Sequence, residues 1–322
     1  MTDRPRISVV VETINARFGS VTRSLIDEVE PTLAALALQT YPADDMETIL
    51  VVDDDASFAA ASEVVRRHPV LRVVRSRRAN YFEAKNAGAA AARGEIVAFA
   101  DSDCLPSPRW VQALVAQIDG GAAAAAGESR YPPDTLAARV FSIFDLAHVI
   151  GECDGATGLN LSNVAFRRDV LLAHPLETRI ERNGGCYLLY KQLRAEGLRV
   201  AYAADAKLTH GYDIRGMFGF ARKHFARGSD GVAVYRLDET AVLAATHAFR
   251  RLGAAALPPI FVRRVVVDWQ RLLGHRRQLG IPLVSLPFFA LLAVLLRGIE
   301  LAGALFAVLR PAPVALESQS AA

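Results

Sequence analysis

The N-terminal hundred residues alternate between short apolar runs and longer segments with helical periodicity. Helices are expected at about 20–39, 57–67 and 83–92. Steady alternation of strand and helix is typical of an α/β domain with a mostly parallel central sheet. Four β-branched runs are the expected strands: Ile7–Val11, Thr48–Val52, Leu71–Arg75 and Ile96–Ala100.

Acidic residues follow two of these strands. Asp53, Asp54 and Asp55 come after the second strand, and Asp101 and Asp103 come after the fourth. Ligands of parallel sheets bind at the carboxyl ends of the strands, so one acidic cleft is expected there. A divalent cation would offset the repulsion between two close carboxylates and would bind diphosphate oxygens. The alternative is a capped turn with both carboxylates solvated.

The pattern of strand and helix continues beyond this point. Glycines on both sides of 122–126 favour a buried strand there, and 151–163 is a loop rich in Gly, Asn and Asp. A further short strand is expected at Arg199–Tyr202. Three more segments have the pattern of helices: Pro106–Ile118, 134–150 and 184–197. We therefore expect a catalytic domain over residues 1–215.

The C-terminal region, 216–322, has a different composition. An amphipathic helix is expected at 216–228, either packed on the catalytic domain or facing a membrane. The segment 257–280 is rich in arginine, and the uncharged run 281–296 after it is shorter than the roughly 20 residues of a spanning helix. Arg297 and Glu300 interrupt this run. The pattern predicts a short span or an interfacial hairpin at an anionic cytoplasmic leaflet, or a buried pair of helices.

Charge and cysteine content narrow the class of protein. A net charge of +3 without a basic face argues against nucleic-acid binding. Three separated cysteines form no disulfide framework, and the N-terminus has no secretory signal. A cytoplasmic protein attached to the inner face of the membrane fits these features.

The stretch 80–110 carries the most specific pattern of the chain. In order it contains Lys-Asn-x-Gly, Ala-x-Gly-Glu, a hydrophobic run, Asp-Ser-Asp and Pro-x-Trp. This order resembles the family 2 glycosyltransferases, which have a GT-A fold. ISVVVETIN and VVDDDAS, at the ends of the first and second strands, resemble two further blocks of that family, with Glu12, Ile14 and Asp55 as departures.

The resemblance implies a nucleotide-sugar site and a divalent metal, Mn²⁺ or Mg²⁺. In that family Asp103 would hold the metal, and His210, in a block resembling the family's later histidine motif, would be a further ligand. Six residues are implied on the nucleotide-sugar side: Thr13, Asp53, Asp54, Lys85, Asn86 and Asp101. The plain alternative for His210 is a structural histidine.

A second family block borders the acceptor site and resembles TGLNLSNVAFRR here. It implies acceptor-side roles for Asn160 and Asn163, and the block after it adds Arg194. Turn chemistry alone also accounts for both asparagines. The acceptor class, whether saccharide, lipid or polymer, is left open.

The block that carries the general base departs from the family. Gly185 and Cys186 stand where the family has Glu and Asp, although an inverting transfer to a hydroxyl needs a base within hydrogen-bond reach. Glu181 is the first candidate and Asp154 the second. The expected function is hexosyl transfer from a nucleotide-diphosphate sugar with inversion. The alternative is a degenerate family member that binds without catalysis. A phosphatase of the haloacid dehalogenase type would leave 80–110 unexplained.

Overall fold

The computed structural model describes residues 4–13, 25–52, 55–68, 70–76, 79–147, 149, 155–211 and 216–310. Within these residues eight strands form one sheet in the order β3-β2-β1-β4-β7-β6-β8-β5. The strands are β1 Ile7–Glu12, β2 Met46–Val52, β3 Leu71–Arg75, β4 Ile96–Asp101, β5 Cys104–Pro106, β6 Ala124–Arg130, β7 Val164–Arg167 and β8 Val200–His210.

The first four strands of the chain pair in parallel, and β6 pairs in parallel with β8. Strand β7 is antiparallel to both β4 and β6, and β5 is antiparallel to β8. The predicted mostly parallel α/β sheet is therefore confirmed. Because β1, β2 and β4 end at the same edge, the residues that follow them meet there.

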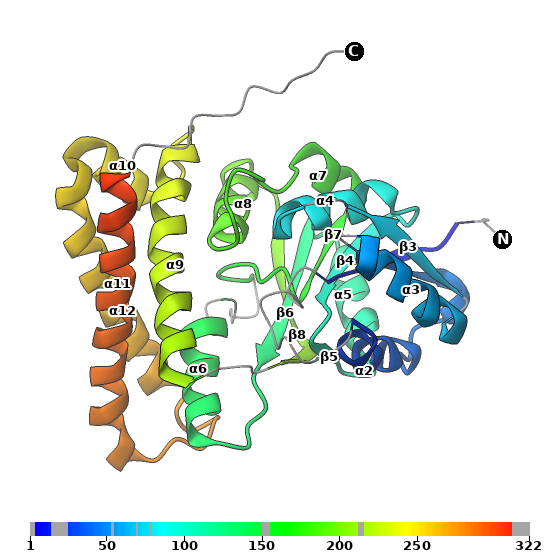
Figure 1. The fold of residues 1–322 in the computed structure, drawn as a ribbon, viewed down its shortest axis with the longest axis horizontal. Helices are drawn as coiled ribbons and strands as arrows, with labels where there is room; N and C mark the ends of the chain where they lie inside the picture. The colour runs from blue at the N-terminus through cyan, green and yellow to red at the C-terminus, as the bar shows by residue number, and fades with distance from the viewer. Residues whose placement is uncertain are drawn as a thin grey trace.

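Helices cover both faces of the sheet (Figure 1). Side chains of a strand alternate between faces, so Val9 and Val11 lie in the core with α2, α3 and α5, whereas Val10 lies in the core with α4 and α8. The helices of this part are α2 Leu25–Ala37, α3 Asp55–Arg67, α4 Tyr81–Ala91, α5 Trp110–Asp119, α6 Leu136–Leu146, α7 Arg168–Ala173 and α8 Gly185–Ala195.

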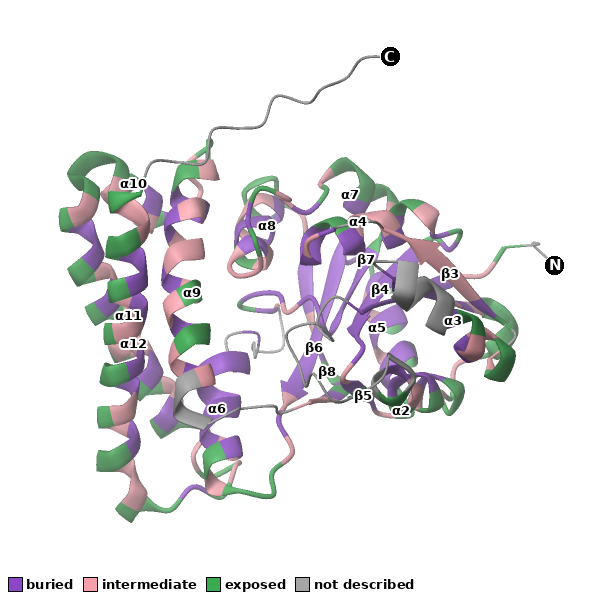
Figure 2. Cartoon of the chain, viewed as in Figure 1, coloured by how far each residue is buried: buried purple, intermediate pink, exposed green. Residues whose placement is uncertain are grey.

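A layer of long helices stands beside the sheet, at the left of Figure 1. It comprises α9 Gly216–Leu237, α10 Ala244–Leu252, α11 Leu257–His275 and α12 Leu286–Leu309. Some of its buried residues, among them Val232 of α9 and Phe261 of α11, belong to the same hydrophobic core as one face of the sheet, whereas others, such as Phe289 of α12, pack in a separate cluster with α6. Figure 2 shows the buried residues continuing from the strands into this layer.

Four sequence expectations change in the structure. Helix α5 begins at Trp110 rather than Pro106, because Cys104–Pro106 pairs with β8 as a strand. Strand β8 runs on to His210, and the segment 164–167 forms a strand that the pattern did not predict. The apolar C-terminal run is neither cut at Arg297 nor folded as a hairpin, since α12 continues through it to Leu309.

Two glycines explain how closely α12 lies against α9. A Cβ atom at Gly228 of α9 would overlap the carbonyl of Glu300, and one at Gly303 of α12 would overlap the carbonyl of Phe225. Only glycine allows this approach of two helix backbones. The amphipathic helix expected at 216–228 is therefore packed within the protein along one side.

Candidate metal and nucleotide-sugar site

Four side chains gather where β4, β5 and β8 meet. Asp101 ends β4, Cys104 begins β5, and His210 ends β8 directly opposite Cys104 in the sheet. Asp103 lies between the two strands. One ligand atom of each of the four residues lies within 4.8 Å of those of the others. The fold thus brings together residues that are more than a hundred positions apart in sequence.

His210 stands between the two carboxylates. Its Nδ1 is 3.5 Å from Oδ2 of Asp103, and its Nε2 is 3.7 Å from Oδ2 of Asp101. The backbone N–H of Gly211 donates to the Asp103 carbonyl at 2.7 Å, and a Cβ at Gly211 would lie 2.9 Å from the same oxygen. The glycine after the histidine therefore allows β8 to approach Asp103 closely.

Asp101 is fixed from below by α4. Lys85 is fully buried and its Nζ is 2.7 Å from Oδ1 of Asp101, while the Tyr81 hydroxyl donates to the same carboxylate at 3.1 Å. Burial alone raises the pKa of Asp101, but the charges of Lys85 and His210 outweigh burial, and the pKa lies below its ordinary value. Asp101 is therefore ionised, and Lys85 lies beneath the carboxylate with no exposed surface.

Asp103 and His210 form the open side of the group. Their side chains keep 32% and 19% of their surface exposed, so a ligand has access to them. Burial and the charge of Asp101 raise the pKa of Asp103, although His210 acts against this rise. Burial lowers the pKa of His210, but Asp103 and Asp101 raise it to about 9. In the absence of a cation the imidazole carries a proton that offsets one carboxylate.

The chemistry of the donor set suits a divalent cation with oxygen and nitrogen ligands. Two carboxylates and one imidazole are typical ligands of Mn²⁺, and carboxylates alone suit Mg²⁺. Cys104 is a weaker candidate because burial and the neighbouring Asp103 raise the pKa of its thiol well above the ordinary value. A protonated thiol is a poor metal ligand. Asp103 and His210 are the residues that fit a metal here.

The residues predicted to contact the nucleotide differ in their location and in their hydrogen-bond partners. Thr13 follows β1 directly, and its hydroxyl donates to the carbonyl of Val51 at 3.0 Å. The Asn86 side chain is bonded on both sides to the backbone of Leu176, at 2.9 and 3.0 Å, which ties α4 to the loop after α7. Asp53 and Asp54 lie outside the described residues.

The predicted acceptor-side residues are not brought together. Asn163 is fully buried, accepts from Trp110 Nε1 at 2.7 Å and donates to the carbonyl of Ala206 at 3.0 Å. Both ends of its amide are therefore used inside the core. Arg194 is exposed near the end of α8. Asn160 is half-buried, and its Nδ2 is a buried donor without a hydrogen-bond partner in the described structure.

The start of α8 has no carboxylate where the family pattern has Glu and Asp, because Gly185 and Cys186 are its first two residues. A Cβ atom at Gly185 would lie 2.7 Å from the ring of Phe82, and one at Gly184 would lie 2.9 Å from Val234 of α9. Burial raises the pKa of the Cys186 thiol to about 11, so this side chain is not a base at neutral pH. Glu181 is exposed in the loop before α8. Asp154 lies outside the described residues.

A second charged group borders the metal site and escaped the sequence interpretation. Asp145 of α6 is buried and receives ion pairs from Lys223 and Arg227, one turn apart on α9. The Tyr131 hydroxyl donates to the same carboxylate at 3.0 Å, and its ring packs edge-on against His210 with centroids 6.0 Å apart. The spacing of the two cations, four residues apart in an amphipathic helix, was the signal that pointed to a shared face.

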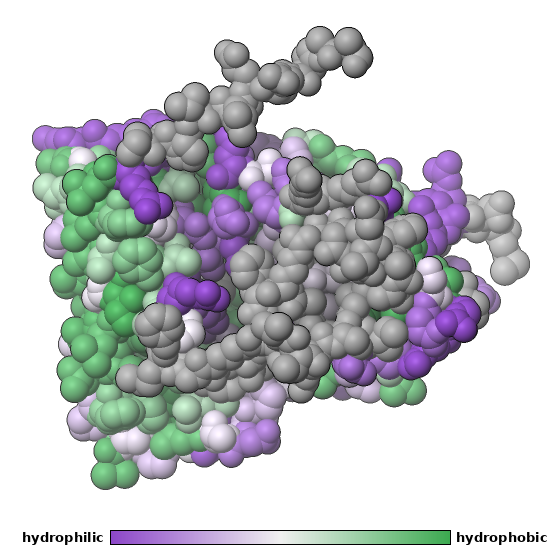
Figure 3. Space-filling model, in the orientation of Figure 1, coloured by the Kyte–Doolittle hydropathy of each residue, from purple (hydrophilic) through white to green (hydrophobic). Residues whose placement is uncertain are grey.

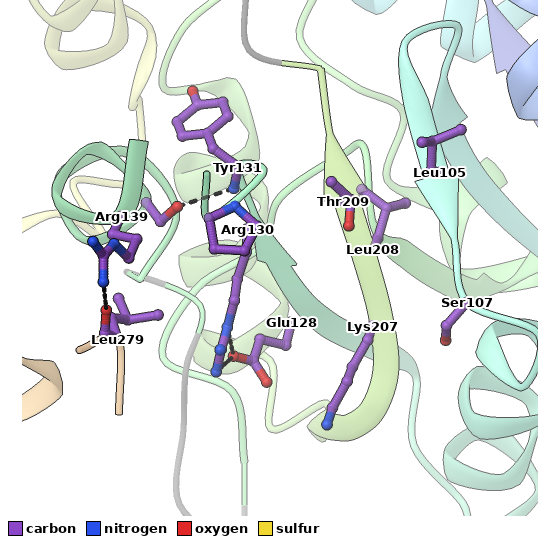
Figure 4. A pocket seen from close by; sticks show the side chains of 12 residues that line it. Leu105, Ser107, Glu128, Arg130, Tyr131, Arg139, Lys207, Leu208, Thr209 and Leu279 are labelled. Carbon is purple, nitrogen blue, oxygen red and sulfur yellow. Dashed lines mark hydrogen bonds and ion pairs between the residues drawn. The ribbon is translucent and has the colours of Figure 1, made fainter. Parts of the chain in front are cut away.

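A hollow of about 320 Å³ lies beside this area, against the C-terminal ends of β6 and β8 (Figure 4). Thr209 and Lys207 of β8 and Arg130 of β6 line it, together with Arg139 of α6. The metal-site residues are not among its lining. Since side chains alternate along β8, Thr209 faces this hollow and His210 faces the carboxylates.

Comparison with known proteins agrees with the sequence pattern and the fold. Residues 8–151 match the model of the family described as Glycosyl transferase family 2. The matched segment is a little under half of the chain, so residues 8–151 are similar to family 2 glycosyltransferases, and the sheet and helices have the GT-A fold.

Individual relatives support this assignment. Glycosyltransferase AglE of Haloferax volcanii is 22% identical over 293 residues, which cover 82% of this chain and 92% of that protein. Validoxylamine A glucosyltransferase of Streptomyces hygroscopicus subsp. jinggangensis is 34% identical over 125 residues, only 27% of its length. The solved mannosyltransferase PcManGT of Pyrobaculum calidifontis, in complex with GDP-Man and Mn²⁺, superposes with a TM-score of 0.60 at 19% identity, covering 96% of this chain and 88% of that one.

Proposed function

We propose that this chain transfers a sugar from a nucleotide-diphosphate sugar to an acceptor in a reaction that depends on Mn²⁺ or Mg²⁺. The observation that carries the proposal is the group of Asp101, Asp103 and His210 at the end of β4, in a domain similar to the family 2 glycosyltransferases. A solved protein of the same fold is described with GDP-Man and Mn²⁺, which supports a similar arrangement here.

The residues of this group have separate proposed roles. Asp103 and His210 hold the cation, and Lys85 and Tyr81 keep the Asp101 carboxylate ionised and fixed beside it. The cation, when bound, neutralises the negative charge that the diphosphate gains as the bond to the sugar breaks. Thr13, Asp53 and Asp54 stand after β1 and β2, where the nucleoside would lie, and Asn86 keeps α4 in place.

A panel of nucleotide-diphosphate sugars tests this proposal. Binding and slow hydrolysis would be measured for the wild-type chain with Mn²⁺, with Mg²⁺ and with a chelator. We expect one donor to bind and to be hydrolysed only when a cation is present. Binding without any hydrolysis or transfer would favour the alternative of a binding protein that has lost catalysis, which the missing carboxylate at Gly185 and Cys186 suggests.

We further propose that the outer face of α11 and α12 lies on a membrane surface. The helical segment Leu283–Leu309 has a mean hydropathy of 2.0 over its most apolar window, and only 28% of that window is buried. Its exposed large side chains follow one stripe of α12, namely Phe288, Leu291, Leu295, Phe306 and Leu309. In Figure 3 hydrophobic residues predominate over this layer, at the left of the view.

The inner face of α12 argues for a position in the interface rather than across the bilayer. Glu300 is fully buried and bonded to His224 of α9, and Arg297 forms two hydrogen bonds with Asp268 of α11. The Gly228 and Gly303 contacts lock α12 onto α9, so α12 cannot cross a bilayer without taking charged residues of α9 with it. Apolar burial with flanking arginines is typical of interfacial helices on anionic lipid.

Vesicle sedimentation tests this placement. The wild-type chain should bind vesicles of anionic lipid and lose only part of this binding at high salt, since salt screens the arginines but not the apolar contact. Phe288→Ser with Leu295→Ser should reduce partitioning at least tenfold, because each side chain contributes roughly 1.5–3 kcal/mol when buried. Leu38→Ser with Val70→Ser, which changes two exposed apolar residues of the sheet domain, is the matched control. Equal losses in both double variants would reject the placement.

A further inference from the structure

The segment before α8 is tied to α9 by one carboxylate. The backbone N–H of Asn183 donates to Oδ2 of Asp230 at 2.9 Å, and the side-chain amide of Asn183 donates to the same oxygen at 2.6 Å. A Cβ atom at Gly184 would lie 2.9 Å from a methyl group of Val234, about one turn further along α9, so the two helices are close at this point. Asp230 therefore supplies a carboxylate beside the start of α8 from a neighbouring helix.

This is also the point where α8 lacks a carboxylate of its own. Its first two residues are Gly185 and Cys186, and burial raises the pKa of the Cys186 thiol to about 11, so the thiol is no base at neutral pH. The charge of Arg227 acts on this thiol, and Asp230 follows Arg227 by three positions on the same side of α9. Three helical positions span about 4.5 Å along the axis. Asp230 is therefore about one turn from the residue that faces Cys186.

The segment that Asp230 holds leads directly to the metal site. Arg182, the residue before Asn183, has its guanidinium group 5.9 Å from the centroid of the Tyr81 ring, and the Tyr81 hydroxyl donates to Asp101. The charge of Arg182 also acts on the pKa of Asp103. The contact between α8 and α9 therefore lies beside the carboxylates that are proposed to face the cation and the donor diphosphate.

The two carboxylates in this area that are not in the metal group differ in their affinity for a proton. Burial raises the pKa of Asp230 above its ordinary value, although the hydrogen bonds from Asn183 act against this rise. Burial acts on Asp145 in the same direction, but the charges of Arg227 and Lys223 outweigh it and hold the pKa of Asp145 well below its ordinary value. A general base is most effective when its pKa is close to the working pH. Asp230 suits this role, and Asp145 does not.

We propose that Asp230 is the base that takes the proton from an acceptor hydroxyl group. This inference rests on the proposed function. Both hydrogen bonds from Asn183 use Oδ2, so the proton goes to Oδ1. The acceptor oxygen forms a bond to the anomeric carbon of the donor sugar, the bond from that carbon to the diphosphate breaks, and the nucleoside diphosphate leaves with the electron pair. The acceptor is accordingly an alcohol or a saccharide hydroxyl.

Hydrolysis of the donor identified by the panel tests this role, with water as the acceptor and the full chain as the enzyme. Asp230→Asn keeps an oxygen that accepts from Asn183, so the contact between α8 and α9 is retained, but the amide cannot take a proton. We expect kcat for hydrolysis to fall by about 10²–10⁴-fold while KM for the donor stays unchanged. Equal melting temperatures of the variant and the wild type verify the fold. A loss of kcat smaller than tenfold would overturn the proposal.

Azide as the nucleophile separates a base from a structural residue. Azide is an anion without a proton to lose, so its attack on the anomeric carbon needs no base. Asp230→Asn should form the glycosyl azide at the rate of the wild type, although it hydrolyses the donor slowly. If the variant slows both nucleophiles by the same factor, Asp230 only positions the segment before α8, and the proposal is wrong.

Carboxylates elsewhere in the area complete the test. Cys186→Asp, made in the Asp230→Asn variant, should restore hydrolysis at least tenfold, because it returns a carboxylate to the first turn of α8. Glu239→Gln, at an exposed carboxylate just beyond the end of α9, is the matched control and should leave both rates unchanged. A loss of 10²–10⁴-fold in Glu181→Gln, with Asp230→Asn near normal, would identify Glu181 as the base instead. A wild-type chain that hydrolyses none of the donors would overturn the proposed function itself, and this inference with it.

Discussion

Two clusters of buried carboxylates and cations differ in how completely their charges are balanced. In the helical layer, Glu300 and Asp268 share Arg297, and Glu300 also accepts hydrogen bonds from Arg264 and His224. At the sheet edge, Asp101 is balanced by Lys85, whereas the charged partner of Asp103 among the described residues is His210, at 3.5 Å. Both clusters contain two carboxylates, yet only the second has an exposed one.

The pKa values follow this difference. Burial alone would raise the pKa of Glu300, but the hydrogen bond from His224 and the charge of Arg297 lower it to about 2. The pKa of Asp103 is instead raised by burial and by Asp101. A carboxylate whose ionised form is disfavoured gains most from an incoming cation. The comparison teaches that buried ion pairs alone do not mark a site, whereas an accessible, incompletely balanced carboxylate does.

The largest expected effect is at Asp103. Asp103→Asn should reduce cation-dependent turnover by about 10³-fold or more, since a catalytic metal contributes several kcal/mol to the transition state. Metal-dependent donor binding should be lost with it. Asp169→Asn, at an exposed carboxylate that forms an ion pair with Arg167, is the control and should leave both unchanged. Donor affinity in Asp103→Asn equal to the wild type, with and without chelator, would remove Asp103 from the site.

Substitution of Lys85 tests whether the ion pair between Lys85 and Asp101 stabilises the fold. Lys85→Met leaves Asp101 buried with Tyr81 but without its cation, and breaking a buried ion pair costs about 3–5 kcal/mol. Urea denaturation should show this loss of unfolding free energy. Turnover should fall as well, because Asp101 loses the charge that keeps it ionised. A stability change below about 1 kcal/mol would show that Lys85 mainly contacts the nucleotide.

Arg297 is the matching test in the helical layer. Arg297→Met leaves two buried carboxylates, although His224 and Arg264 still contact Glu300, so we expect a loss near the lower end of the same range, about 3 kcal/mol. Donor binding by the folded fraction should not change, because this cluster is closed to ligands. A variant of normal stability with weak donor affinity would contradict the distinction between the two clusters.

The sequence predicted the sheet well because its strands are buried runs of β-branched residues, which are unambiguous in a parallel α/β domain. It missed β5 and β7, since strands as short as Cys104–Pro106 and Val164–Arg167 are defined by their partners rather than by their own pattern. The helix start predicted at Pro106 was wrong for the same reason, because Pro106 is part of β5. Pairing with distant strands determines that these segments become strands, and their local sequence contains no signal for it.

The sequence predicted the site residues that belong to one recognisable motif. It did not predict the contacts that form between segments distant in sequence. Asp101 and Asp103 are two residues apart, and a matched histidine block pointed to His210. The burial of Lys85 depends on how α4 lies under β4, and the charge on Asp145 depends on how α9 crosses α6. For the same reason, the sequence placed Asn163 near the acceptor, although its amide joins Trp110 to Ala206 inside the core.

The smallest expected effect is the pH dependence of cation binding. Asp103 and Asp101 raise the pKa of His210 to about 9, so below that pH a cation must displace a proton from the imidazole. Because the concentration of competing protons rises as pH falls, the apparent affinity for Mn²⁺ should decrease on acidification. It should change by at most tenfold per pH unit between about pH 6 and 8. Spectroscopic titration of free Mn²⁺ at three pH values measures this slope. His210→Gln should bind Mn²⁺ more weakly at pH 8 and with a flatter slope, whereas an unchanged slope would show that His210 is not a ligand.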